Sequence, residues 1–324
     1  MRGVGLGERS LESHRMRSST IAADPGDSAT SKATPPWSGL ALAFFGSIAF
    51  SGKAIIVKLA YRHGVDAVTL IMYRMLFALP LFVALAWWAG RGKAPLTRRD
   101  WIVVTALGFS GYYLASFLDF AGLAYVSAGL ERLILYLSPT LVLGLGALLF
   151  KRRVAGRQLV ALAVSYLGAL VVFGHEVQLQ GSHVALGGAL VFGSTVSYAL
   201  YLVYSGEEVK RLGALRLTGL ASSVACGFCI VQFLLLRPLA AAEVAPAVIW
   251  LSILNAGLCT VAPVLMVMMA IERVGAAVAA QFGMVGPLST ILMGVWLLGE
   301  PFSGTMALGT ALVLAGIWLL TAWR

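Results

Sequence analysis

Residues 126–139 read VSAGLERLILYLSP, and residues 274–287 read VGAAVAAQFGMVGP. Aligned without a gap, both stretches begin on Val-x-Ala and end on a proline, Pro139 in the first and Pro287 in the second. The same alignment pairs Gly146, Gly156, Ala163 and Gly168 with Gly294, Gly304, Ala311 and Gly316. Apolar helices share alanine and leucine by chance, so the paired prolines and the ungapped spacing carry the inference. The chain therefore contains two related halves.

The composition around this repeat is that of a membrane protein. Of the 324 residues, 59% are hydrophobic and 12% are charged, and the mean hydropathy is +0.88. Soluble proteins are about 45–50% apolar and about 25% charged, so no water-soluble fold could bury this much apolar surface. The three cysteines, Cys226, Cys229 and Cys259, lie in apolar stretches, and we interpret the Cys226-Gly-Phe-Cys229 spacing as helix packing rather than as a redox motif.

Ten apolar stretches are each long enough to cross a bilayer, which takes roughly 20 helical residues. They cover residues 38–60, 67–89, 101–124, 127–150, 155–174, 184–206, 217–236, 247–270, 275–298 and 303–323. The segments between them are short, which excludes a large soluble domain. We therefore predict an all-α, polytopic membrane protein with ten transmembrane helices.

Residues 1–36 differ from the rest of the chain. They are rich in Ser, Thr, Gly, Arg, Asp and Pro, and they contain no apolar run long enough for a signal peptide. We expect a disordered cytoplasmic tail, in which Met16 is an alternative translation start to Met1.

Positive charge is concentrated in the tail and in alternate loops, which predicts the orientation. The basic loops carry Arg91, Lys93, Arg98 and Arg99, then Lys151, Arg152, Arg153 and Arg157, then Lys210 and Arg211. The intervening loops contain little positive charge beyond Arg62 and Arg237. The positive-inside rule places both termini in the cytoplasm, and we expect a multi-pass protein of the plasma (inner) membrane. The net charge of +10 is thus a topology signal, and no nucleic-acid partner is predicted.

Five spans per half is an odd number, so the second half must enter the membrane from the opposite face. Inverted-topology repeats of this kind build alternating-access transporters. We therefore predict two inverted five-helix repeats related by a pseudo-two-fold axis in the membrane plane.

The paired motifs resemble the EamA type of the drug/metabolite transporter superfamily. The likeness rests on Val126-Ser127-Ala128-Gly129-Leu130 running to Pro139, and on residues 274–277 running through Pro287 to Leu298-Gly299-Glu300-Pro301. Family members often have Gly-Glu after the fourth span, where this chain has Phe150-Lys151-Arg152. The resemblance implies EamA-like repeats over residues 37–175 and 183–323, a central cavity, and export or exchange of small metabolites such as amino acids.

Several charged residues fall inside the predicted spans of the first half, where a charge is costly. Lys53, Arg74, Asp119 and Glu131 all lie about 6 to 13 Å below the outer surface, given a rise of about 1.5 Å per residue. Glu131 is expected to point inward, whereas Arg132 lies near enough to the surface to snorkel.

Two interpretations of this layer remain open. In the structural one, an Arg74–Asp119 or a Lys53–Glu131 pair relieves the desolvation cost and positions the helices. In the functional one, Lys53 or Arg74 binds a substrate carboxylate while Asp119 or Glu131 binds an amine or a proton. Proton coupling of transport is the consequence of the second interpretation if one carboxylate takes up a proton.

The second half contributes polar groups without charge at this depth. Tyr198, Tyr201, Asn255 and Gln281 are candidate substrate contacts, with helix packing as the alternative for the tyrosines. Pro139 and Pro287 are candidate hinges, because each proline frees a backbone carbonyl and kinks its helix.

Catalysis is not expected from this sequence. All four histidines lie in the tail or in loops, so an intramembrane metal site or a Ser-His dyad has no histidine to use. No P-loop pattern occurs, and no cofactor is predicted. The expected function is secondary transport of a small polar or amphipathic metabolite by a monomer or homodimer. The alternative is a membrane scaffold or sensor that transports nothing.

Overall fold

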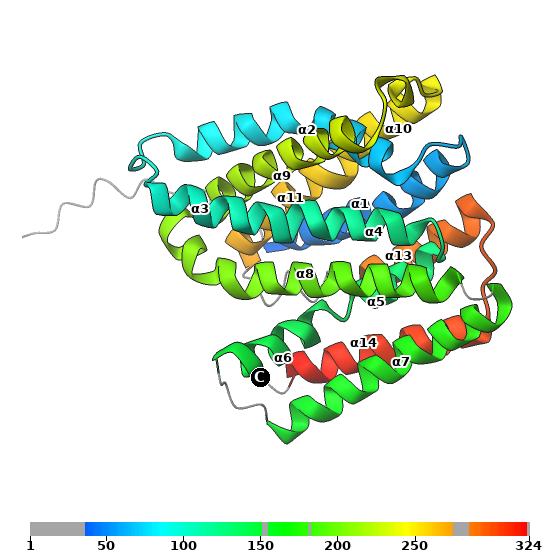
Figure 1. Ribbon diagram of the computed structural model, residues 1–324. Coiled ribbons are helices and arrows are strands. Elements are labelled where there is room, and N and C mark those ends of the chain that lie inside the picture. Colours follow the sequence, from blue (N-terminus) through cyan, green and yellow to red (C-terminus); the bar gives the residue numbers. More distant parts are fainter. Residues whose placement is uncertain (1–35, 151–154, 181–182, 275–284, 323–324) are drawn as a thin grey trace, which may run out of the picture. The chain divides into compact units, whose positions relative to one another are not determined.

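The computed structural model describes residues 36–150, 155–180, 183–274 and 285–322 (Figure 1). All regular structure in these ranges is helical, which confirms the all-α class. The first half comprises α1 (Pro36–Tyr61), α2 (Ala67–Gly90), α3 (Arg98–Leu107), η1 (Gly108–Leu114), α4 (Ala115–Leu123), α5 (Ala128–Leu135), α6 (Ser138–Phe150) and α7 (Gly156–Gln180). The second comprises α8 (His183–Leu212), α9 (Ala214–Leu236), η2 (Leu239–Ala242), α10 (Pro246–Ala256), η3 (Gly257–Val261), α11 (Ala262–Val274), α13 (Val285–Met293), η4 (Gly294–Leu298) and α14 (Gly304–Ala322).

These helices account for the ten predicted spans. Among the described residues, eight helical segments are long and apolar enough to cross a membrane, and two shorter apolar helices cover Val285–Leu298 and Gly304–Leu319. The ninth span was predicted to begin at residue 275, and its residues 275–284 lie outside the described ranges. The chain is therefore a multi-pass membrane protein built from two five-span halves.

In the described ranges, three spans are interrupted in the middle. The third span of the first half, Arg98–Leu123, contains the π-helix η1, and the third span of the second half contains the π-helix η3. The fourth span breaks at residues 136–137, so that α6 begins at Ser138 and Pro139 lies in its first turn, where a missing N–H is tolerated. The predicted kink at Pro139 is therefore a break between two helices.

The closest helix pairs all join one half to the other. Helix α1 packs on α11, α4 on α8, α2 on α9, and α7 on α14. A two-fold axis that relates the halves exchanges the α1–α11 pair with the α4–α8 pair. The same axis maps the α2–α9 pair and the α7–α14 pair each onto itself. The packing thus has the arrangement that the inverted repeat requires.

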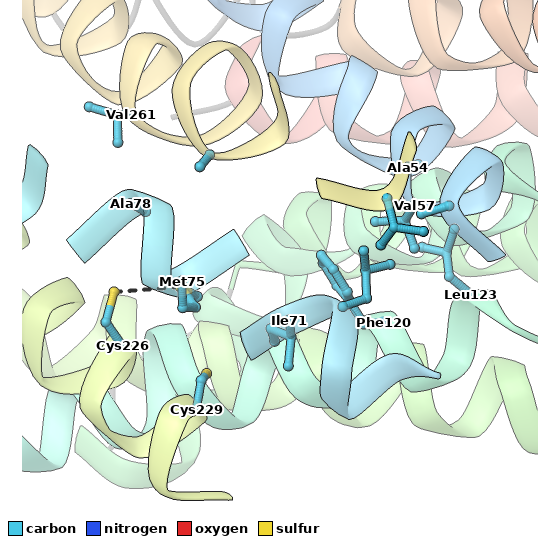
Figure 2. Close-up of a cluster of buried hydrophobic side chains, with 14 of the residues drawn as sticks. Ala54, Val57, Ile71, Met75, Ala78, Phe120, Leu123, Cys226, Cys229 and Val261 are labelled. Carbon is cyan, nitrogen blue, oxygen red and sulfur yellow. Dashed lines mark hydrogen bonds between the residues drawn. The ribbon is translucent and has the colours of Figure 1, made fainter. Parts of the chain in front are cut away.

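The largest apolar core lies where these pairs meet. In Figure 2, Phe120 and Leu123 of α4 lie beside Ala54 and Val57 of α1, and all four are fully buried. The same cluster continues through α2 to Cys226 and Cys229 of α9. All three cysteines are free and buried, as expected for packing residues.

Candidate functional site

A cluster of ionised side chains lies beside this apolar core, and Lys53 of α1 is its centre. The Lys53 ammonium donates a hydrogen bond to Oδ2 of Asp119, on α4, and its Nζ lies 3.2 Å from Oε1 of Glu131, on α5. Lys53 is 7% exposed, Asp119 is 3% exposed and Glu131 is fully buried. The sequence suggested a Lys53–Glu131 pair or an Arg74–Asp119 pair. The first of these forms, and Asp119 pairs with Lys53 instead of Arg74.

The start of α5 explains how Glu131 reaches this position. Ser127 caps the helix, because its hydroxyl accepts a hydrogen bond from Leu130 N at 3.0 Å. Glu131 follows in the first turn, where a carboxylate is favoured by the partial positive charge of the helix N-terminus. The cap therefore holds an acidic residue inside the bundle at low cost.

Arg132 does not snorkel to the surface, so that expectation was wrong. The side chain is 2% exposed. Its Nε donates to Thr290 Oγ1 of α13 at 3.0 Å, and its Nη2 donates to the carbonyl oxygen of Phe50 at 3.1 Å. The guanidinium also lies 5.3 Å from the centre of the Phe50 ring. These partners, contributed by both halves, replace water and keep Arg132 inside the protein.

Arg74 of α2 has a different environment. It is 4% exposed, its Nη2 donates to Ser116 Oγ at 3.0 Å, and its guanidinium lies 4.7 Å from the centre of the Phe120 ring. Within the described part of the chain, no carboxylate lies within 4.0 Å of it, and its Nε has no hydrogen-bond partner. The predicted Arg74–Asp119 pair does not form, and Arg74 is a buried cation with spare donors.

Other polar atoms in this part of the bundle also lack hydrogen bonds. They include Oδ1 of Asp119, both carboxylate oxygens of Glu131, and both side-chain polar atoms of Asn255, which is 1% exposed on α10. Helix α10 packs against α1 and α2, which carry Lys53 and Arg74. Buried polar groups in proteins nearly always have partners, so these atoms are hydrogen-bonding groups that the described side chains leave unused.

The described charges of the buried layer do not cancel. Lys53, Arg74 and Arg132 supply three positive charges, whereas Asp119 and Glu131 supply two negative charges. With every group ionised, the layer carries one excess positive charge. An anionic group would neutralise it.

The two predicted tyrosine contacts belong to another cluster. Tyr201 of α8 is buried, and its hydroxyl lies 3.2 Å from the hydroxyl of Tyr112 in η1. Tyr198 stacks on Tyr201 with 5.7 Å between ring centres. This aromatic cluster adjoins apolar side chains such as Leu107 and Leu217. In the described residues, neither tyrosine bonds to the charged layer.

The remaining predicted residues differ in what the structure describes. Gln281 lies outside the described ranges. Pro287 is buried in the first turn of α13, next to Gly286, whose carbonyl accepts a hydrogen bond from Ser51 Oγ at 2.9 Å. A side chain on Gly286 would collide with the Tyr136 hydroxyl at the break in the fourth span. The proline segments of the two halves therefore lie against each other.

A pair of acidic side chains that the sequence pattern did not reveal, Glu176 and Glu300, lies at the end of the bundle that carries the α1–α2 loop. Glu176 of α7 accepts hydrogen bonds from the hydroxyl and the backbone N–H of Ser127, and Glu300 accepts one from Ala128 N at 2.9 Å. Glu176 follows the predicted end of the fifth span, but α7 continues to Gln180 and buries it. Extending the predicted fifth span by one helical turn would have placed Glu176 inside the bundle.

A polar pocket of about 360 Å³ opens beside this acidic pair. Its lining residues are Lys58, Tyr61, Arg62, Leu123, Ala124, Leu298 and Glu300. Arg62 also donates to the carbonyl oxygen of Leu298 at 2.7 Å, which joins the α1–α2 loop to the second half. Nearby, Asp66 pairs with Arg237 at 3.1 Å. Although partial burial opposes it, hydrogen bonds from Thr69 and Arg237 hold the pKa of Asp66 below its ordinary value.

The opposite end of the bundle has its own ionic link between the halves. Arg211, at the end of α8, pairs with Asp100 of α3 and with Glu208 at 2.7 Å. The hydrogen bonds that Arg211 donates to Asp100 and Glu208 raise the pKa of Arg211 above its ordinary value. Lys93 and Arg216 add hydrogen bonds to backbone carbonyls across the same junction. Both ends of the bundle are thus closed by polar contacts between halves.

No group of three or more potential metal-ligating side chains occurs among the described residues.

Comparison with known proteins agrees with this architecture. The model of the EamA-like transporter family matches the chain twice, over residues 37–174 and 185–322. An uncharacterized transporter of Bacillus subtilis, YcbK, is 31% identical over 270 residues, covering 81% of this chain and 86% of the relative. A WAT1-related protein of Arabidopsis thaliana is 28% identical over 195 residues, covering 51% of this chain and 55% of the relative.

A solved crystal structure has the same fold. It superposes with a TM-score of 0.60 at 18% identity, covering 89% of this chain and 97% of that structure. The two family matches together cover most of the chain, one in each half. The chain therefore belongs to the EamA-like transporter family, within the drug/metabolite transporter superfamily.

Proposed function

We propose that this transporter moves a small metabolite carrying a carboxylate, such as an amino acid, and that Arg74 binds the carboxylate. One observation carries the proposal: Arg74 is 4% exposed and has no carboxylate within 4.0 Å in the described residues. A guanidinium offers five donors in a planar fork that matches a carboxylate. Its Nη2 donates to Ser116 Oγ and to the Met75 sulfur at 3.9 Å, and its Nε has no hydrogen-bond partner.

The energetics support a ligand at this position. Removing a cation from water costs several kcal/mol, and a partner of opposite charge offsets much of this cost. Lys53 has two carboxylates and Arg132 has polar partners from both halves, whereas the described partners of Arg74 are uncharged: a hydroxyl, the Met75 sulfur and an aromatic ring. The excess positive charge of the layer favours an anion in the same place. Asn255, whose amide is unsatisfied, would bind a further polar group of the substrate.

The same architecture supports our proposal of transport by alternating access. The halves pack as exchangeable pairs, and each end of the bundle carries polar links between them. We propose that the links at the two ends break in turn, and that the helix break near Pro139 and the first turn of α13 at Pro287 act as hinges. Proton coupling through Asp119 or Glu131 remains the alternative to a purely structural role for these carboxylates.

The membrane context completes the proposal. The basic loops support a cytoplasmic location for both termini. We propose that the protein acts in the plasma membrane, as a monomer or homodimer, as an exporter or exchanger. We propose that the two repeats cover residues 37–175 and 183–323. The predicted cytoplasmic tail, residues 1–36, lies outside the described ranges except for Pro36, the first residue of α1. No enzymatic activity is proposed. A scaffold that transports nothing would have no use for a buried, unpaired arginine.

The test uses purified full-length protein in proteoliposomes. Flux is measured for a panel of metabolites that carry a carboxylate, each matched with its amide or its decarboxylated amine. We expect the wild type to move one or more carboxylates and to discriminate against the matched neutral or cationic analogues. Arg74→Gln should abolish this flux, and Arg74→Lys should weaken substrate binding at least tenfold because a lysine cannot bind both oxygens in a planar fork.

Arg157→Gln serves as the matched control, because Arg157 is an exposed arginine outside the buried layer. Thermal unfolding of each variant verifies folding, and a substrate-induced rise in Tm measures binding independently of flux. If the transported compound lacks a carboxylate, or if Arg74→Gln retains wild-type affinity for it, the assignment of Arg74 is wrong.

A further inference from the structure

A second cavity lies on the outside of the bundle, away from the charged layer. It has a volume of about 580 Å³, and all of its lining residues except Phe228 of α9 come from one face of α3 and η1. Arg98, Trp101, Ile102, Ala106 and Phe109 recur on this face at helical spacing. Trp101, Ile102 and Phe109 are 48%, 62% and 42% exposed, so the cavity opens outward as a groove between α3 and α9.

The groove is polar at one end and apolar along the rest of its length. Arg98 stands at its mouth, at the first residue of α3, and makes no hydrogen bond or ion pair in the described residues. At the other end, Phe109 and Phe228 pack edge to face with 5.5 Å between ring centres, and Tyr113 packs against both rings. These aromatic side chains close the groove inside the membrane.

The length of the groove matches one leaflet of a bilayer. Eleven residues separate Arg98 from Phe109, which is about 16 Å along a helix, and half of the hydrocarbon core is about 15 Å. Trp101, one turn inside the mouth, is the residue type that prefers the headgroup layer. The groove therefore begins at the headgroups and ends near the middle of the bilayer.

The loop at the mouth is strongly basic. Arg91, Lys93, Arg98 and Arg99 fall within nine residues, and Lys210 and Arg211 lie in the neighbouring α8–α9 segment. Clusters of four or more such residues next to a transmembrane helix attract anionic lipids. Arg99 is 80% exposed and its nearest acidic partner is 3.8 Å away, whereas Arg98 faces the groove with no acidic partner.

We infer that this groove binds one anionic phospholipid from the leaflet that contacts the α2–α3 loop. One acyl chain lies along Ile102, Ala106 and Phe109, and the phosphate receives hydrogen bonds from Arg98. A lipid that only filled the outer surface would need neither the closed aromatic end nor an unpaired arginine at the mouth. The site lies outside the charged layer, so it does not depend on the proposed substrate.

The inference is tested by native mass spectrometry of the purified full-length protein with dioleoylphosphatidylglycerol and dioleoylphosphatidylcholine. We expect one phosphatidylglycerol to bind more tightly than phosphatidylcholine. Arg98→Gln should weaken phosphatidylglycerol binding about fivefold, which is the effect of about 1 kcal/mol for one arginine near an anionic lipid. Ala106→Trp should remove the bound lipid, because the indole fills the groove.

Two matched variants separate a specific site from general attraction. Arg99→Gln removes the same charge one residue away from the groove, and Ala84→Trp adds the same bulk at an exposed alanine of α2. Both should retain the tightly bound lipid. If Arg98→Gln and Arg99→Gln weaken phosphatidylglycerol binding equally, the effect is one of surface charge alone. If Ala106→Trp leaves lipid binding unchanged, the groove is not the lipid site. Either result overturns the inference.

Discussion

At the scale of single residues, the central feature is one lysine shared by two carboxylates. Lys53 forms a hydrogen bond with Asp119 but only an ion pair, at 3.2 Å, with Glu131, whose oxygens have no hydrogen bond. Removing the hydrogen-bonded partner of a buried cation destabilises the protein more than removing a partner in a weaker contact. The two carboxylates therefore have unequal roles even though they share one partner.

This inequality predicts unequal effects of neutralisation. Asp119→Asn should lower the free energy of unfolding by about 3 kcal/mol, which is the order of the cost of breaking a buried pair, and Glu131→Gln should lower it by less. If the carboxylates are structural, each variant weakens substrate binding at every pH. Thermal unfolding and substrate counterflow, each measured at several pH values, test these expectations.

The same variants decide the proton-carrier alternative. A carrier replaced by its amide loses flux driven by a pH gradient but retains counterflow, because counterflow needs no net proton movement. If Glu131→Gln behaves in this way, the structural interpretation is wrong. If both variants leave binding and flux unchanged, the charged layer has no part in the mechanism.

At the scale of elements, the fifth spans of the two halves pack through glycines. A Cβ on Gly168 of α7 would lie 2.6 Å from the carbonyl oxygen of Gly309 on α14, and one on Gly309 would lie 2.7 Å from the carbonyl oxygen of Gly168. A Cβ on Gly316, which the repeat pairs with Gly168, would collide with Ser165. Small residues allow this backbone approach, which is how helices associate closely in a membrane.

Two glycine-to-alanine substitutions in α7 should therefore change the stability of the protein in opposite directions. Gly168→Ala forces the α7 and α14 backbones apart and should destabilise the protein by about 1 to 3 kcal/mol, as overpacking does. Gly174→Ala lies in the same helix with no atom within 4 Å of the added Cβ. It should stabilise the helix by about 0.5 to 1 kcal/mol. Thermal unfolding of both variants measures the difference, and a neutral Gly168→Ala would contradict the packing.

At the scale of the whole molecule, polar links between halves occur at both ends of the bundle. Arg62 and the Asp66–Arg237 pair join the halves at one end, and the Arg211–Asp100 pair joins them at the other. Asp100 and Arg211 lie beside the strongly basic loops, whereas Arg62 and Asp66 lie beside loops with little positive charge. The charge asymmetry between the ends sets the expected orientation.

A reporter experiment tests this orientation. A fluorescent protein fused after residue 324 should fluoresce, and alkaline phosphatase fused after residue 180 should be active, because the first reporter works in the cytoplasm and the second outside it. The reverse pattern, phosphatase activity after residue 324 or fluorescence after residue 180, would show that the positive-inside assignment is wrong. Fusions after residue 151 provide a cytoplasmic control within a basic loop.

The sequence by itself determined the helical class, the ten spans and the division into halves. These properties are local: a run of about 20 apolar residues spans a bilayer wherever its neighbours lie, and an odd number of spans per repeat forces inversion. The sequence also indicated that Lys53, Asp119 and Glu131 share one depth, because depth follows from position along a helix.

Only the tertiary structure decided which of these groups are partners. The depth of a residue in the membrane does not say toward which neighbouring helix its side chain points. The structure shows that Lys53 rather than Arg74 pairs with Asp119, and that Arg132 contacts Thr290 of the other half instead of water. Glu176 was missed because it follows an apolar run whose helix continues to Gln180. Only the packing of α2 against α4 likewise shows that Arg74 has no carboxylate partner, because the side chains around it come from segments distant in the chain.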